Sequence, residues 1–447
     1  MYTNVTSILS YEDAVDLRNR YIGKSCSLFY RDDPLKIVRA YKQYMYDDKG
    51  NEYLDCINNV AHVGHCHPLV VQSECHQAAT LCTNSRFLHD NMLLYAQKLV
   101  SLFPPSLSVC FFVNSGSEAN DLALQLAQCH TQAGDVITVD DAYHGHLIPL
   151  VAISPYKYKQ RKFYNKPDWV HVASVPDTYN GRYRRQSDDE NTDFGLLYAK
   201  EVENIIKNVQ IRNRKIAAFI AESLLSCAGQ ILLPSNYLRN VYQYVREAGG
   251  VCIADEVQVG FGRVGTHWWA FQLQGEDVIP DIVTLGKPMG NGHPISAVVT
   301  TAAIADSFYK AGGGYFNTFG GNPVSCAIAL SVLHVIESED LMKNAYEVGI
   351  YILDLLNQLQ IKHEIIGDVR GIGLFIGIEL VRDRVTKEPA ITEAKTVCDL
   401  LKKNFIIVSR DGLHGNILKL KPPMVFTKQN ANIFIEKLDN ILSNLIL

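Results

Sequence analysis

Short apolar runs alternate with segments of helical periodicity through the middle of the chain. Apolar side chains recur at helical spacing over residues 118–130 and 237–247, and Gly249-Gly250 ends the second segment. Runs typical of buried strands span 109–113, 136–139, 217–221, 251–254 and 282–285. This alternation predicts an α/β fold in which helices cover both faces of a mostly parallel sheet. We assign it to a large domain over residues 60–322.

The two ends of the chain have a different pattern. Residues 36–56 contain alternating segments around the turn Asp47-Asp48-Lys49-Gly50, which predicts a hairpin. A long helix is predicted from Pro323, followed by strands at 374–380 and 406–409 and by a closing helix. The sequence therefore predicts a small α+β domain built from both termini, residues 1–59 and 323–447.

Composition excludes several classes of protein. The chain has 447 residues and a net charge of -5, with no Lys/Arg-rich stripe that would indicate a nucleic-acid partner. No run of about 18 apolar residues predicts a membrane span. Its 11 cysteines include no CxxC pair, which favours reduced thiols in an intracellular protein. Glu12, Asp13 and Asp16 argue against a transit peptide. We therefore expect a cytoplasmic or mitochondrial-matrix location, without a clear targeting signal.

The residues that follow the predicted strands deserve inspection, because ligands of open parallel sheets bind beyond the carboxyl ends of the strands. After 109–113 come Asn114-Ser115-Gly116-Ser117-Glu118, followed by a helix. Small residues at a helix N-terminus can present backbone N–H groups to a phosphate. The alternative is a simple helix cap made by Ser115 or Ser117, and this segment alone favours the cap.

An acid and a lysine follow two later strands. Asp255 ends the run 251–254, where a buried carboxylate needs a cationic partner, such as a protonated pyridine nitrogen, a helix N-terminus or an arginine. Lys287 follows 282–285 at the start of a Gly/Pro-rich loop. A desolvated lysine there would be nucleophilic, whereas an exposed one would be unremarkable. Together, a phosphate cradle, a buried acid and a cleft lysine are what a pyridoxal 5'-phosphate (PLP) site requires, with Lys287 as the Schiff-base lysine.

At these residues the chain resembles the class III PLP-dependent aminotransferases, and the resemblance runs from about Asp32 to the end. The matching segments are NSGSEAND (114–121), DDAYHGH (140–146), ADEVQVGFGR (254–263), TLGKPMGNGHP (284–294) and NTFGGNP (317–323). Within that family it is similar to the alanine–glyoxylate aminotransferase 2-like branch, which includes ethanolamine-phosphate and 5-phosphohydroxylysine phospho-lyases. The segments that carry this second resemblance are DPLKIVRA (33–40), TNSRFLHDN (83–91), AESLLSCAGQ (221–230) and NILKLKPPMVF (416–426).

The resemblance implies the PLP-dependent transferase fold of type I and a role for each matching residue. Lys287 would be the catalytic lysine, and Asp255 would pair with the pyridine nitrogen. Thr318 would reach the cofactor phosphate of a neighbouring subunit, which implies a homodimer. The remaining cofactor-binding candidates are Gly116 and Ser117 at the phosphate, Tyr143 and His144 beside the ring, Glu222 on the substrate side, and Gln258 near the ring hydroxyl.

One departure bears on the reaction. Many class III transaminases carry an Arg shortly before a Pro-Pro pair, where it can hold a substrate carboxylate. Lys419 occupies this stretch here, and a lysine lacks the planar fork of an arginine. Arg86, Lys419 and His62 are candidates for binding a substrate phosphate. His62, His65 and His67 could also form a metal site, but no further ligand cluster supports one.

The sequence thus favours a lyase that eliminates phosphate from a phosphorylated primary amine, either phosphoethanolamine or 5-phosphohydroxylysine. The products would be an aldehyde, ammonia and phosphate, which indicates phospholipid or amino-acid metabolism. The alternative is a transaminase that moves an amino group to an oxo-acid. Both reactions begin with removal of a proton by Lys287, so motifs separate them weakly.

Overall fold

A seven-stranded sheet forms the centre of the larger part of the molecule. The computed structural model describes residues 8–185, 191–312 and 314–445. Strand β10 (Ser296–Thr300) is antiparallel to both of its neighbours, so the other six strands run in one common direction. The sheet order is β4 (Val109–Val113), β10, β9 (Ile282–Leu285), β8 (Val251–Asp255), β7 (Ile216–Glu222), β5 (Asp135–Val139) and β6 (Val170–Ala173).

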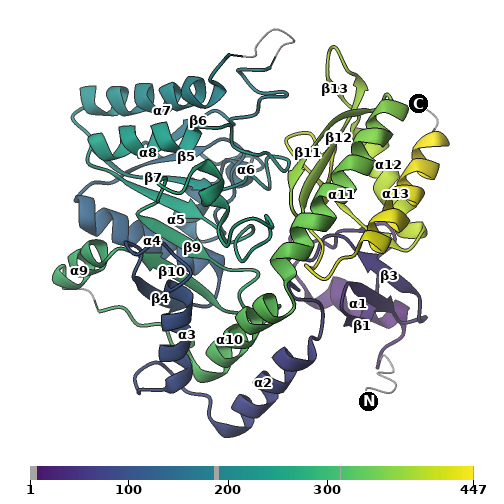
Figure 1. Cartoon of the computed structure of the whole chain (residues 1–447), viewed down its shortest axis with the longest axis horizontal. Helices are drawn as coiled ribbons and strands as arrows, with labels where there is room; N and C mark the ends of the chain where they lie inside the picture. The colour runs from purple at the N-terminus through teal and green to yellow at the C-terminus, as the bar shows by residue number, and fades with distance from the viewer. Residues whose placement is uncertain (1–7, 186–190, 313, 446–447) are drawn as a thin grey trace.

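Helices cover both faces of this sheet (Figure 1), as the alternation along the strands requires. In β7, Ala218 and Ile220 pack toward α4 (Gly116–Thr131) and α5 (Ile148–Ala152), in one apolar cluster. The intervening Phe219 and Ala221 belong to a second cluster with α7 (Phe194–Ile211) and α8 (Tyr237–Glu247). The predicted α/β class with a mostly parallel sheet is therefore confirmed.

Other helices surround this layer. Helix α10 (Pro323–Ser338) packs against α2 (Pro68–Thr80) and α3 (Asp90–Val100), and α9 (Ala302–Lys310) packs against α4. The short elements are α6 (Pro155–Tyr158) and the 3-10 helix η1 (Ala270–Gln274). Within the described residues, no helix combines the length and apolar character that crossing a membrane requires.

Both termini contribute to the smaller part of the molecule, on the right in Figure 1. Its first sheet joins the hairpin strands β1 (Ile37–Tyr41), β2 (Tyr44–Asp47) and β3 (Glu52–Asp55) to β14 (Ile406–Ile407), which is parallel to β3. A second sheet contains β11 (Ile366–Ile372), β12 (Phe375–Asp383), β13 (Glu388–Pro389), β15 (Ser409–Asp411) and β16 (Ile417–Leu420). Its helices are α1 (Tyr11–Tyr21), α11 (Leu341–Lys362), α12 (Ile391–Lys403) and α13 (Lys428–Ser443).

The α+β character of the ends agrees with the sequence-based expectation, and the domain boundaries at 59/60 and 322/323 stay predictions. One expected element is corrected. The single strand predicted at 406–409 is two strands, because the chain leaves β3 after Ile407 and joins β16 from Ser409. Only Val408 separates the two strands, so the pattern along the chain shows no turn between them.

Candidate active site

The candidate catalytic and cofactor-binding side chains lie along one edge of the large sheet. Because β4, β9, β8, β7 and β5 run in the same direction, their carboxyl ends meet at that edge. A cavity of about 290 Å³ lies there, and side chains from the loops after all five strands line it. Those lining residues include Gly116, Ser117, Tyr143, His144, Glu222, Asp255, Gln258 and Lys287. The fold thus brings together eight of the nine cofactor-binding residues that the sequence singled out.

The N-terminus of α4 forms one wall of the pocket. Ser115 is its N-cap and accepts a hydrogen bond from the backbone N–H of Glu118, as the simple cap reading predicts. None of the hydrogen bonds within the described chain uses the backbone N–H groups of Gly116 or Ser117, which leaves both as donors. A Cβ on Gly116 would lie 2.6 Å from Cγ1 of Val257, so glycine is needed for this close packing. The segment is thus a capped helix start that also leaves two backbone donors available for an anion.

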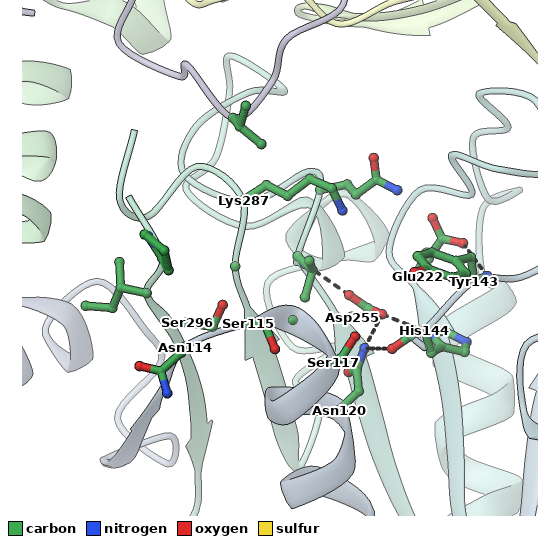
Figure 2. Close-up of a pocket in the computed structure, with 18 of the residues that line it drawn as sticks. Asn114, Ser115, Ser117, Asn120, Tyr143, His144, Glu222, Asp255, Lys287 and Ser296 are labelled. Carbon is green, nitrogen blue, oxygen red and sulfur yellow. Dashed lines mark hydrogen bonds and ion pairs between the residues drawn. The ribbon is translucent and has the colours of Figure 1, made fainter. Parts of the chain in front are cut away.

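Asp255 lies at the centre of a buried hydrogen-bond network (Figure 2). Its Oδ2 accepts from Nδ1 of His144 and Nδ2 of Asn120, each at 2.8 Å, and its Oδ1 accepts from the backbone N–H of Val257 at 3.0 Å. His144 is its one ion-pair partner among the described residues. Within the described ranges no arginine or lysine forms an ion pair with this carboxylate, which is only 4% exposed and can pair with a ligand cation.

Lys287 follows β9, and its side chain reaches across the pocket above Asp255 (Figure 2). Its backbone N–H donates to the carbonyl of Val257 at 3.0 Å, which anchors the start of the Gly/Pro-rich loop. Burial lowers the pKa of the Lys287 amine, and the nearby Asp255 carboxylate opposes that shift. A larger fraction of the amine is then neutral and nucleophilic than in an exposed lysine.

Glu222, at the end of β7, and Tyr143, in the loop after β5, also line the pocket. The carboxylate of Glu222 accepts from the backbone N–H groups of Tyr143 at 3.2 Å and Ser226 at 3.0 Å. Burial raises the pKa of Glu222, and the carboxylate of Asp255 raises it further. The ammonium of Lys157 lies 5.6 Å from the ring centroid of Tyr143, so a cation lies next to this lining residue.

Thr318 and Arg86 lie outside the pocket of this chain. Thr318 is exposed in the loop before α10. Arg86 is also exposed, and its guanidinium lies 4.3 Å from the ring centroid of Phe316, two residues from Thr318. The two candidates thus occupy the same part of the surface, although 232 residues separate Arg86 from Thr318. (318 − 86 = 232.)

His62 requires a correction as a phosphate-binding candidate. It is fully buried, with Nε2 2.7 Å from the carbonyl oxygen of Phe261 and Nδ1 accepting from Arg263 at 3.1 Å. Burial, reinforced by the Arg263 charge, lowers the pKa of His62 to about 3. Both ring nitrogens are occupied and His62 does not line the pocket, so it is not placed to bind a phosphate, and it serves instead to hold Arg263 in place.

Lys419 is near the pocket but already paired. Its ammonium lies 2.5 Å from a carboxylate oxygen of Asp411, and this pairing raises the pKa of Lys419 despite its burial. Asp411 would have to be displaced before Lys419 could bind a substrate group. Lys419 thus carries a positive charge that is largely neutralised locally.

The three histidines of residues 62–67 do not converge. His65 pairs with Asp55 at 2.7 Å and His67 with Glu339 at 2.9 Å, while His62 contacts Phe261 and Arg263. No group of three His, Cys, Asp or Glu side chains suited to a metal was found in the described parts of the chain.

The pocket fits PLP. A helix N-terminus with two free backbone donors suits its phosphate, the buried carboxylate of Asp255 suits a pyridinium nitrogen, and Lys287 suits its aldehyde. Bound PLP supplies an aldehyde that bonds to amines and a protonated ring that accepts electrons from a neighbouring bond. The three features occupy separate walls of one cavity, as a single ligand requires.

Sequence reasoning missed several members of the site. Asn120 donates to Asp255, and its Oδ1 accepts from Thr284 at 2.7 Å. The available signal was an asparagine on the otherwise apolar inner face of a helix, next to Ala119. Lys421 and Ser226 bind the carboxamide of Gln258, as described below. A lysine beside two prolines carries no comparable signal, because lysines are ordinarily exposed.

The chain is similar to known proteins over nearly its whole length. Residues 30–442 match the family model described as aminotransferase class-III. The chain is 56% identical over 428 residues to alanine–glyoxylate aminotransferase 2-like of Drosophila melanogaster, which covers 96% of this chain and 86% of that protein. It is 46% identical over 445 residues to ethanolamine-phosphate phospho-lyase homolog 1 of Caenorhabditis elegans, covering 98% of this chain and 94% of that protein.

Solved structures of other enzymes share the fold of this chain. A phospholyase from Arthrobacter in complex with phosphoethanolamine superposes with a TM-score of 0.91 at 37% identity, covering 97% of this chain and all of that chain (100%). An aminotransferase from Bacillus anthracis superposes with a TM-score of 0.87 at 27% identity, covering 98% of this chain and 100% of that one. Both kinds of reaction thus occur among proteins that share this fold.

Proposed function

We propose that this chain, which belongs to the class III aminotransferase family, is a phospho-lyase acting on a phosphorylated primary amine. Family membership makes it a PLP-dependent enzyme, either a lyase or a transaminase. The proposal concerns which reaction it catalyses. The substrate would be phosphoethanolamine or 5-phosphohydroxylysine, and the products an aldehyde, ammonia and inorganic phosphate.

The ion pair between Lys419 and Asp411 carries this proposal. Transamination of amino acids requires a cation that holds the substrate carboxylate, and a bidentate arginine is the best such group. Lys419 takes that place in the sequence, but its ammonium is bound to Asp411 at 2.5 Å. An amine without a neighbouring carboxylate needs no such clamp. The similarity to a phospholyase crystallised with phosphoethanolamine supports the same choice.

The residues of the pocket suit an elimination. Lys287 Nζ would take the proton from the carbon next to the substrate nitrogen, and the C–O bond on the adjacent carbon would break as phosphate departs. Water then completes the reaction to aldehyde and ammonia, so no oxidant or second substrate is consumed. The leaving phosphate carries two negative charges and needs cations around it. Lys157 is a cation close to the pocket, next to the lining residue Tyr143, although it does not line the pocket itself.

We also propose a homodimer that completes the site. Arg86 and Thr318 lie outside the pocket of their own chain, on a surface that also exposes the apolar side chains of Phe87, Leu88 and Phe319. Exposed apolar patches of this kind mark protein–protein contacts. In a homodimer, this surface would bring Arg86 and Thr318 to the partner's cofactor and substrate phosphate.

The cytoplasmic or mitochondrial location stays a prediction. Two relatives, from Arabidopsis thaliana and Homo sapiens, are named as mitochondrial.

An assay with paired substrates tests the reaction. We expect the holoenzyme to release phosphate and ammonia in equal amounts from phosphoethanolamine or 5-phosphohydroxylysine, without any oxo-acid. Each amine is compared with its unphosphorylated counterpart, with and without pyruvate or glyoxylate. Product that forms only with the oxo-acid, with no phosphate released, would show that the enzyme is a transaminase.

Removing the charge of Arg86 tests the subunit contribution. We expect Arg86→Ala to raise KM for the phosphorylated amine about tenfold or more, because a lost hydrogen bond to a charged group costs about 1.5–3 kcal/mol. Affinity for PLP should change little. Arg161→Ala is the matched control, since Arg161 is also exposed and lies over an aromatic ring, that of Tyr164. Equal KM values for the Arg86 and Arg161 variants would contradict the assignment.

A further inference from the structure

Lys421 is a buried lysine without an acidic partner. It follows β16 directly, is only 3% exposed, and its ammonium contacts Oε1 of Gln258 at 2.6 Å and Oγ of Ser226 at 2.8 Å. No ion pair of Lys421 occurs among the described residues, in contrast to Lys419, which pairs with Asp411. Burying an unpaired lysine is costly, so its contacts call for a functional explanation.

The hydrogen bonds around Lys421 determine which end of the Gln258 side chain faces it. Lysine only donates when protonated, so the atom of Gln258 next to its ammonium must be the carbonyl oxygen. Ser226 agrees with this orientation. Its hydroxyl donates to Oε1 of Gln230 at 3.1 Å, and the alternative acceptor at 3.4 Å is again Oε1 of Gln258. Lys421 is thus the donor to the oxygen of Gln258, and Ser226 can donate to that oxygen only in place of Gln230.

The nitrogen end of Gln258 is left for the pocket. Gln258 lines the cavity with Asp255 and Lys287, and no hydrogen bond within the described residues uses its Nε2. We propose that Lys421 is a positioning residue that holds the carboxamide of Gln258 with its NH2 group presented to the cofactor as a donor. The role applies whichever reaction the enzyme catalyses, because it concerns the cofactor and not the substrate.

The charge state of Lys421 decides how firmly it holds this orientation of Gln258. Burial, together with the charges of Lys419, Lys287 and Arg263, lowers the pKa of Lys421 well below its usual value, and Cys227 opposes the shift. A neutral amine keeps two N–H bonds for Gln258 and Ser226, but its lone pair can also accept from Nε2 of Gln258, so the protonated form is the one that enforces a single orientation. A low charge also limits repulsion with Lys287, which must itself gain and lose a proton.

A donor at this position favours an oxygen anion on the cofactor over its protonated form. Without Lys421, the carboxamide of Gln258 can rotate and present either its oxygen or its nitrogen. In Lys421→Met, we therefore expect the pH midpoint of the visible absorbance of the bound cofactor to rise by roughly one unit. The melting temperature should stay the same or increase, since an apolar side chain of similar volume replaces an unpaired buried lysine.

A double-mutant cycle separates positioning from a direct charge effect. The absorbance of the PLP-loaded enzyme is titrated with pH for wild type, Lys421→Met, Gln258→Ala and the double variant. If Lys421 acts through Gln258, its replacement shifts the midpoint in wild type but not in the Gln258→Ala background. Lys402→Met is the control, because Lys402 is also buried but contacts Asp33, away from the pocket.

The remaining outcomes overturn the proposal. They are a folded Lys421→Met enzyme with an unchanged midpoint, an equal shift in the Gln258→Ala background, and an equal shift in the Lys402→Met control. Should Lys421→Met not fold, Ser226→Ala decides the question. It loosens the Lys421 ammonium without removing it, so a smaller upward shift supports the proposal and no shift overturns it.

Discussion

Replacing Lys287 with Ala is expected to abolish turnover and to remove the covalent link between the chain and PLP. The side chain lies in the pocket beside Asp255, and burial lowers its pKa, so its amine is suited to bonding with an aldehyde and to accepting a proton. Loss of the proton transfer alone costs about 10²–10⁴ in rate. The measurements are kcat and the absorbance of bound cofactor after borohydride treatment.

Two controls distinguish a chemical role from an electrostatic one. Lys287→Arg keeps a positive charge but has no free amine, and we expect it to be as inactive as Lys287→Ala. Small primary amines added to Lys287→Ala should restore part of the rate, because they can accept the proton in solution. A borohydride-stable link between PLP and either variant would place the covalent lysine elsewhere in the chain.

Asp255→Asn should retain PLP but lose about two to four orders of magnitude in kcat, at the scale of a lost proton-transfer or charge-stabilising group. A carboxylate close to the pyridine nitrogen favours its protonated form, and a neutral amide does not. The amide of the asparagine can still turn its oxygen, an acceptor, toward the donors His144 and Asn120, which lie 2.8 Å from Oδ2 of Asp255. The measurements are kcat and the pH dependence of the cofactor absorbance.

Asp135 provides the matched control for Asp255. Both are buried acids on parallel strands of the same sheet, but Asp135 begins β5 and pairs with Arg214 at 2.6 Å, at the edge away from the pocket. Asp135→Asn should lower the melting temperature and leave the cofactor spectrum unchanged. Near-normal kcat in Asp255→Asn, with a similar loss of stability, would mean that Asp255 is also a purely structural acid.

The central strands were predictable because their composition follows directly from burial. Strand β9 occupies Ile282–Leu285 and helix α8 Tyr237–Glu247, at the residues that the apolar pattern indicated. Parallel strands covered on both faces are apolar throughout, so they stand out in a sequence. Strand β10 was not expected, although Ser296–Thr300 is fully buried. It is antiparallel within a parallel sheet, and local sequence does not encode strand direction.

Lys287 and Asp255 could be identified from the sequence because each stands directly beyond a buried strand, where the fold class alone predicts a ligand. His62, Lys419 and Lys421 could not be interpreted in this way. All three are basic residues near polar or turn segments, and only their neighbours decide their state. His62 is neutral beside Arg263, Lys419 is paired with Asp411, and Lys421 lacks an acid and binds Gln258.

The α/β architecture and the residues at the ends of the strands could be predicted from the sequence, because periodicity and residue type act over a few neighbouring positions. The cofactor was predicted from three strand ends taken together and from the resemblance to a family. Which basic side chains are charged and free, and which surface carries Arg86 and Thr318, depends on the fold. The reason is that pKa values and hydrogen bonds depend on groups that folding brings together, such as Gln258 and Lys421, which are 163 residues apart.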